Sequence, residues 1–159
     1  MPPATFKNLD ALNDFVGREI GVTDWFEVTQ ERIGQFAEAT DDRQWIHLDP
    51  DRAQRESPYA ATIAHGFLTL SLLSHLSQGA FQIQQGVGMI VNYGLNRVRF
   101  PAPVPAGSKI RARFRLQSLK DVGNAREAVF SVVVERQSGE NQAQAKPSCV
   151  AEWVVRYYP

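Results

Sequence analysis

Polar and hydrophobic residues alternate along much of the second half of the chain, the pattern of a β-strand with one solvated and one buried face. Between residues 109 and 116, Lys and Arg occupy every odd position and apolar residues every even one. Residues 149–158 alternate in the same way. Residues 128–135 are rich in β-branched side chains and predict a more buried strand.

Turn-forming residues divide this strand-rich half. Residues 101–107 hold three prolines, which cannot join a hydrogen-bonded ladder, and so predict a turn between strands. Segments 121–124 and 137–140 carry glycine beside polar residues and predict chain reversals. Together these signals predict about four antiparallel strands after Gly88.

Earlier in the chain the apolar residues recur at helical spacing. Residues 30–40 predict an amphipathic helix with Thr29 as its N-cap. Pro50, preceded by Asp49 as a cap, predicts the start of a shorter helix. Residues 66–76 are apolar around nearly the whole circumference, so they predict a long helix that is buried on all sides.

These elements, with a short strand at 25–28, predict one α+β domain that spans residues 1–159. An antiparallel sheet wrapped around a single buried helix satisfies the pattern. A lone sheet leaves an edge strand exposed, which favours a homodimer formed by edge pairing.

Composition narrows the functional classes. Seventeen basic residues balance seventeen acidic ones, which argues against broad nucleic-acid binding. The single cysteine, Cys149, excludes an internal disulfide and fits a reducing compartment. The first residues hold no apolar leader, and the longest apolar stretch, 63–76, is shorter than the ~20 residues that span a bilayer. We expect a cytoplasmic protein with neither a nucleic-acid nor a membrane partner.

The segment around Asp42 and His47 carries the main candidate chemistry. Five residues at 100° each would place the two side chains about 140° apart on a continuous helix, so they converge only if the chain leaves the helix between them. A carboxylate and an imidazole that face each other can hold a water molecule and move its proton near neutral pH. An aspartate at a helix end is also an ordinary cap, and a lone histidine is also an ordinary structural residue.

A second candidate group opens the long apolar helix. The backbone N–H of Gly66 is unpaired within the helix and feels its positive end, so it can stabilise a developing oxyanion. Close packing explains a glycine there equally well. We expect His65 to support its neighbours rather than bind a metal, because the three histidines lack zinc-type spacing. The Ser74 hydroxyl most often would bond back to its own helix.

In this order, these residues resemble the MaoC-like hydratases, also called (R)-specific enoyl-CoA hydratases. The first block of the resemblance includes Phe36-Ala37, Asp42, His47, Asp49-Pro50 and Ala53. The second block runs from His65-Gly66 to Ser74, and the segment from Val98 to Gly107 also resembles the family's strand-turn-strand. The family's glycine, asparagine and proline are replaced here by Asp41, Gln44 and Trp45, as in the subgroup named after nodulation protein N.

The resemblance implies a homodimer of the hot-dog fold, in which the acyl chain of a CoA thioester enters a tunnel near the dimer interface. It implies that Asp42 and His47 are catalytic and hold the water that adds to the 2,3-double bond. Gly66 would polarise the thioester carbonyl, and Ser74 would lie beside the acid/base pair. With these we group His65 and Gln44 as oxyanion- or substrate-binding residues.

The expected reaction is therefore reversible hydration of trans-2-enoyl-CoA to (R)-3-hydroxyacyl-CoA by a hydro-lyase. We expect no metal or redox cofactor, with coenzyme A present only as part of the substrate. Two alternatives stay open at this point: a hot-dog acyl-CoA thioesterase and a non-catalytic acyl-CoA-binding domain.

Overall fold

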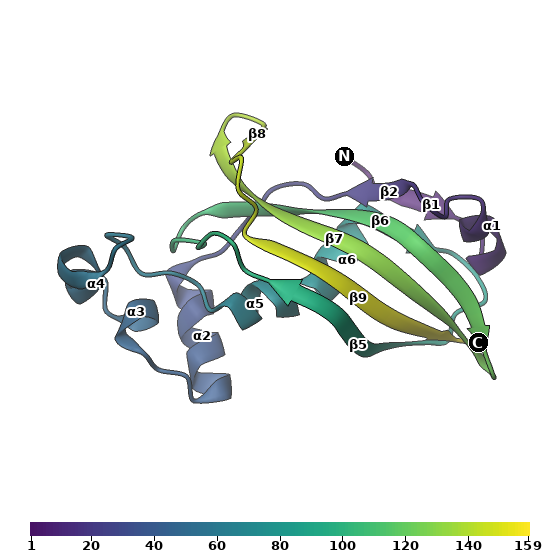
Figure 1. Cartoon of the computed structure of the whole chain (residues 1–159), viewed down its shortest axis with the longest axis horizontal. Helices are drawn as coiled ribbons and strands as arrows, with labels where there is room; N and C mark the ends of the chain where they lie inside the picture. The colour runs from purple at the N-terminus through teal and green to yellow at the C-terminus, as the bar shows by residue number, and fades with distance from the viewer.

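The computed structural model describes all 159 residues, and an antiparallel sheet dominates it (Figure 1). The hydrogen-bonded order of its main strands is β2-β6-β7-β9-β5, with β3 also pairing with β6 and β8 with β7. These strands are β2 (Glu19–Val22), β3 (Phe26–Glu27), β5 (Met89–Arg99), β6 (Lys109–Val122), β7 (Ala125–Gly139), β8 (Gln142–Ala143) and β9 (Cys149–Tyr158). A separate parallel pair joins β1 (Ala4–Phe6) to β4 (Phe81–Ile83).

The helices lie before the four long strands in sequence. They are α1 (Leu9–Asn13), α2 (Gln30–Thr40), α3 (Trp45–Leu48), α4 (Pro50–Glu56), α5 (Gly66–Ser71) and α6 (Leu73–Ala80). Thr29 accepts a hydrogen bond from the Arg32 N–H and caps α2, as its position predicted. Asp49 caps α4 in the same way through the Arg52 N–H, with Pro50 at the first helical position.

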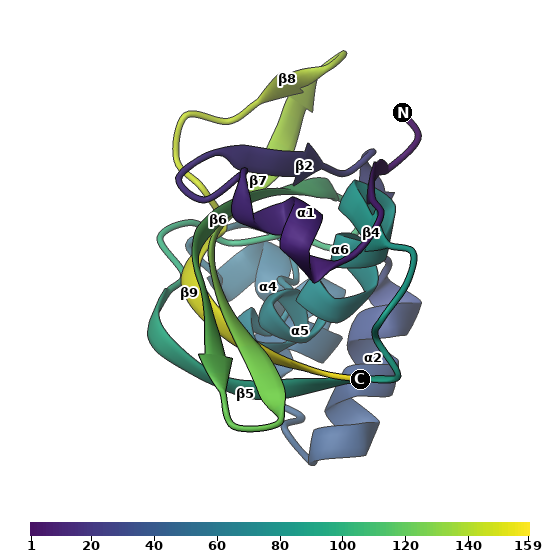
Figure 2. The same cartoon turned by 90° about the vertical axis from the view of Figure 1, so that its right-hand side faces the viewer.

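The long strands curl around α6, so the sheet and this helix enclose the core (Figure 2). The alternation in β6 is confirmed, because the even positions from Ile110 to Leu116 are all 0% exposed. Apolar side chains of β7 pair with them across the ladder, as Phe114 does with Val132. Full burial of one such side chain contributes about 1.5–3 kcal/mol, so this face of the sheet fixes the register.

The predicted long helix differs from the expectation in two ways. It is divided at Leu72 into α5 and α6, and its first turn is not buried on all sides. Phe67 is 68% exposed and stands edge-to-face with Phe100, the ring centroids being 6.1 Å apart. The prediction of burial all round was wrong for α5 because the curled sheet of one chain covers only one side of that helix.

Two of the basic residues of β6, Arg111 and Arg113, are held in ion pairs. Glu135 binds both Arg111 and Arg113, at 2.6 and 3.0 Å, and Arg113 also reaches Glu19.

No helix of the chain combines the length and the apolar character needed to cross a membrane.

Strand β5 forms one edge of the sheet and is unusually apolar for an exposed edge. Met89, Ile90, Tyr93 and Leu95 are each between 42% and 61% exposed. Native proteins normally protect such edges with charge, proline or a covering element. This edge has the composition of an interface.

Candidate active site

The chain leaves α2 between Asp42 and His47, as their convergence requires. Helix α2 ends at Thr40, and Asp41 adopts the left-handed conformation with φ 60° and ψ 15°. Non-helical residues follow until α3 begins at Trp45. Side-chain donor atoms of Asp42, His47 and His65 all lie within 4.8 Å of one another. The side chains of Asp42 and His47 therefore lie close together, and the imidazole of His65 lies beside them.

His47 is held on both its ring and its backbone. It is 6% exposed, its Nδ1 lies 2.7 Å from the Ile63 carbonyl oxygen, and its own carbonyl accepts a 2.7 Å bond from Gln30 Nε2. A carbonyl oxygen can only accept, so Nδ1 carries the hydrogen and the neutral ring keeps its lone pair on Nε2. Burial lowers the pKa of His47, and the neighbouring His65 lowers it further, against the opposite effects of Ile63 and Asp42. The ring is therefore a neutral base at physiological pH.

His65 lies directly against this pair. Its ring stacks on that of His47 with centroids 3.7 Å apart and planes inclined by 22°. Its Nε2 lies 2.9 Å from the Asp42 carbonyl oxygen and 4.0 Å from the Asp42 carboxylate. Phe36 covers another side of the ring at 4.9 Å between centroids.

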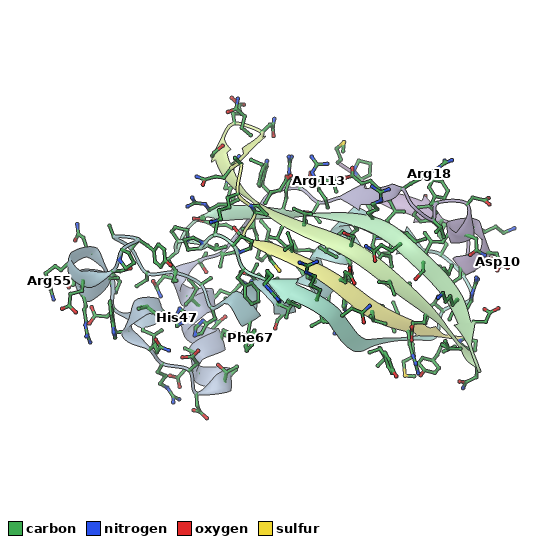
Figure 3. The ribbon with its side chains drawn as sticks, in the orientation of Figure 1. Asp10, Arg18, His47, Arg55, Phe67 and Arg113 are labelled. Carbon is green, nitrogen blue, oxygen red and sulfur yellow. The ribbon has the colours of Figure 1, made fainter.

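These side chains line one cavity of about 420 Å³. Its lining combines polar groups with three phenylalanine rings: Phe36, Thr40, Asp42, His47, His65, Gly66, Phe67 and Phe100. The Asp42 side chain is 48% exposed, whereas both imidazoles are buried. Figure 3 shows His47 and Phe67 at the end of the molecule where α2, α3 and α5 lie, with Asp10 and Arg18 at the opposite end. A carboxylate and an imidazole base beside an apolar surface can activate water next to an apolar substrate.

Gly66 begins α5 and lies on the wall of the same cavity. A Cβ atom at this position would stand 2.9 Å from Cδ2 of Phe100, so the aromatic ring packs directly on the glycine. The Gly66 N–H donates to no backbone carbonyl in a turn, loop or helix cap. Gly66 therefore both packs against Phe100 and keeps its N–H available.

The donor atoms of Asp42, His47 and His65 are close enough to suggest a cation site, but the rings are poorly arranged for one. A metal ion lies near the plane of each imidazole that binds it, and two rings stacked at 3.7 Å do not direct their lone pairs at one point. His47 Nδ1 and His65 Nε2 also face backbone carbonyls. The donor set fits proton transfer better than metal coordination.

Two predicted site residues lie elsewhere in the chain. Ser74 lines a separate cavity of about 210 Å³, where Asn92 donates to its hydroxyl over 3.3 Å. Eight helical residues from Gly66 correspond to about 12 Å, which explains why one chain does not bring Ser74 to Asp42 and His47. Gln44 is exposed at the start of α3 and does not line the catalytic cavity.

Sequence reasoning missed several groups that shape the site. The pattern placed Phe67 in a helix buried on all sides and Phe100 in the strand-turn-strand segment from Val98 to Gly107, so neither was identified as a residue of the site. The Ile63 carbonyl belongs to the backbone and has no side-chain signature. Phe36, by contrast, was part of the first recognised motif.

Comparison with known proteins agrees with this geometry. Residues 12–138 match the family described as the MaoC like domain. The 3-hydroxyacyl-thioester dehydratase Z of Mycobacterium tuberculosis (strain ATCC 25618 / H37Rv) is 47% identical over 154 residues, covering 96% of this chain and 97% of that protein. Nodulation protein N of Rhizobium leguminosarum bv. viciae is 42% identical, covering 88% of this chain and 84% of the relative.

Solved structures show the same fold at lower identity. The (R)-hydratase from A. caviae involved in PHA biosynthesis superimposes with a TM-score of 0.68 at 24% identity, covering 91% of this chain and 96% of that one. A monoamine oxidase regulatory protein from Archaeoglobus fulgius gives a TM-score of 0.73 at 20% identity, covering 100% and 99% of the two chains. The hot-dog fold predicted from the motifs is confirmed. The chain therefore belongs to the MaoC-like family, in the group that includes nodulation protein N, and it is a hydro-lyase of the hydratase or dehydratase type.

Proposed function

We propose that the protein catalyses reversible hydration of trans-2-enoyl-CoA to (R)-3-hydroxyacyl-CoA. The observation that carries the proposal is the meeting of Asp42 and His47 at one cavity with apolar walls. The (R) stereochemistry is drawn from the likeness to the (R)-hydratase fold, and the thioester from the name of the mycobacterial relative.

The first step is attack by a water molecule held between the Asp42 carboxylate and His47 Nε2. The pair takes one proton from the water as its oxygen bonds to C3 of the enoyl group. The electrons of the double bond move onto the thioester, giving an enolate. The same pair then returns one proton to C2, so the elements of one water are added and no group is lost. We assign the proton to the pair rather than to either residue, because both side chains would contact the same water molecule.

The enolate oxygen needs a hydrogen-bond donor, and we assign this role to the Gly66 N–H. It lies on the same cavity wall as the acid/base pair. Donors of this kind contribute about 10²–10³-fold to the rate in other enzymes. The phenylalanine rings at Phe36, Phe67 and Phe100 supply apolar surface against which the enoyl carbons can pack.

The proposed active form is a homodimer paired through β5. That strand ends beside Phe100, so an interface along it would lie next to the catalytic cavity. Its exposed apolar side chains support this arrangement. The mechanism uses only side chains and backbone groups of the protein, with coenzyme A as the carrier of the substrate and no metal or redox cofactor.

A spectrophotometric assay across enoyl-CoA chain lengths, with free thiol measured in parallel, tests the proposal. Loss of the enoyl absorbance without thiol release, and formation of the (R) product, is the expected result. Thiol release would identify a thioesterase instead. Saturable binding without turnover, unchanged in Asp42→Asn, would identify a non-catalytic acyl-CoA-binding domain.

A further inference from the structure

His65 contacts both members of the proposed catalytic pair, and only 3% of its surface is exposed where it lines the cavity. Its ring stacks on His47, and its Nε2 reaches the backbone carbonyl of Asp42. We propose that His65 is a positioning residue that holds the Asp42 segment and the His47 ring in one geometry. This inference rests on the proposed function, and it replaces the expectation that His65 binds the substrate or an oxyanion.

The hydrogen bond to Asp42 fixes the tautomer of His65. Because the Asp42 carbonyl oxygen accepts, Nε2 must carry the hydrogen, which leaves Nδ1 as a bare lone pair in the neutral ring. That Nδ1 atom is buried and has no hydrogen-bond partner. Protonation would create a buried N–H donor without an acceptor, which is costly. In the neutral ring the geometry therefore places the hydrogen on Nε2 and none on Nδ1.

The two rings around His65 carry no charge, whereas one nearby group is anionic. The imidazole of His47 covers one face, and the Phe36 ring packs against the His65 ring. The Asp42 carboxylate lies 4.0 Å from Nε2, where its charge would attract an imidazolium, but it is half-exposed and solvent weakens that effect. Two stacked imidazolium rings would repel each other, so the stack disfavours a charge on both rings at once. The lowered pKa of His47 agrees with this arrangement. Stacking thus holds the base in the form that accepts a proton.

Burial separates this role from substrate binding. His65 is 3% exposed, one ring nitrogen is used by Asp42, and the other is inaccessible. Neither ring nitrogen is therefore available to a substrate, and the residue acts through its neighbours. The positioning effect can be large, because a misplacement of about 1 Å at a reacting group can reduce the rate by about 10²-fold.

Two substitutions separate the two contacts. His65→Phe keeps an aromatic ring against His47 but removes the Nε2–H, whereas His65→Gln keeps an amide donor for the Asp42 carbonyl but removes the stack. Each should lower kcat by about 10-fold to 10²-fold while changing KM much less, since no substrate contact is lost. In His65→Gln the acidic limb of the kcat/KM profile should also move to higher pH, because the His47 ring loses part of its buried surroundings.

His75→Phe is the matched control, because His75 is exposed on α6, packs on Phe26 and does not line the catalytic cavity. It should leave kcat and the pH profile unchanged. Wild-type kcat and an unshifted profile in both His65 variants would overturn the proposal.

A measurement on the purified wild-type protein remains informative if the variants do not fold or if the protein catalyses a different reaction. ¹⁵N NMR of the histidine rings should show His65 as the neutral Nε2–H tautomer and His47 as the neutral Nδ1–H tautomer at pH 7. A cationic His65, or its Nδ1–H tautomer, would contradict the inference even where hydratase activity is found. Absence of hydratase activity with both tautomers as expected would instead count against the proposed reaction alone.

Discussion

The carbonyl oxygen of Ile63 lies 2.7 Å from Nδ1 of His47 and fixes the direction in which this histidine can act. The Ile63 N–H in turn donates to the Ile46 carbonyl, and the next residue, Ala64, donates to Val104 in the segment between β5 and β6. The segment between α4 and α5 thus connects His47 to the turn that precedes β6. Since Nδ1 is occupied, Nε2 is the ring nitrogen through which His47 can take part in the proton transfer proposed for the pair.

Removal of either member of the pair should abolish most of the activity. We expect Asp42→Asn and His47→Ala each to lower turnover by at least about 10²-fold, the usual scale of general acid–base catalysis. Asp42 is half-exposed, so the folded state of Asp42→Asn should persist, which circular dichroism would check. Asp41→Asn is a suitable control, because this neighbouring carboxylate is 81% exposed and does not line the cavity. A near-normal rate in Asp42→Asn or His47→Ala would contradict the mechanism.

The lowered pKa of His47 predicts how activity and stability depend on pH. His47 should stay neutral below its ordinary value of 6.5, so kcat/KM should remain high at pH 6.5 and fall only at more acidic pH. For stability, a group with a lowered folded pKa takes up protons more readily when unfolded. The His47 contribution is therefore complete above pH 6.5 and is lost as pH falls through the folded pKa. Rate profiles and chemical denaturation between pH 5 and about 8 would test both statements.

Asp41 occupies the left-handed position that ends α2, where glycine is the usual residue. A comparison of Asp41→Gly with Asp41→Ala isolates the backbone effect, because both variants lose the same exposed ion pair with Arg43. The glycine variant should have the larger free energy of unfolding, by about 1 kcal/mol, since a Cβ atom disfavours this conformation. Urea denaturation of the two variants would measure the difference. Equal stability would mean that the turn is not held in the left-handed region.

Gly66 lies too close to Phe100 to accept a side chain without movement of the ring. Gly66→Ala should lower the free energy of unfolding by about 1–3 kcal/mol, the range for overpacking. Adding Phe100→Ala should remove most of that cost relative to Phe100→Ala alone, because the two changes share one contact. Gly79→Ala is the control: its Cβ would meet no atom within 4 Å, so this change should be neutral or stabilising.

The parts predicted from sequence are those with a local physical signal. Alternation identified β6, and the caps at Thr29 and Asp49 identified two helix starts. The motif pointed to Asp42 and His47, and these two residues line the same cavity. The exposure of Phe67 was missed, because periodicity shows that a helix is apolar but not which of its sides another element covers. The prediction that Ser74 lies beside Asp42 and His47 does not hold within one chain, because sequence similarity gives no distance between residues.

The sequence also did not predict that the ring of His65 stacks on that of His47. Eighteen residues separate the two histidines, and only the path of the 57–65 segment brings their rings to 3.7 Å. Sequence indicated that His65 supports its neighbours. Its hydrogen bond to the Asp42 backbone carbonyl, like that of His47 to the Ile63 carbonyl, has no side-chain pattern that would report it.

The apolar edge at β5 leads to a prediction about assembly. If a second copy pairs there, a charge at Ile90 or Leu95, which are 61% and 42% exposed, would be forced into the interface. Ile90→Lys and Leu95→Lys should therefore shift the protein from dimer to monomer in analytical ultracentrifugation, and should lower hydratase activity if the interface supports the nearby cavity. Val16→Lys is the matched control, because Val16 is 44% exposed but lies outside the edge strand. A dimer that survives both edge substitutions would place the interface elsewhere on the molecule.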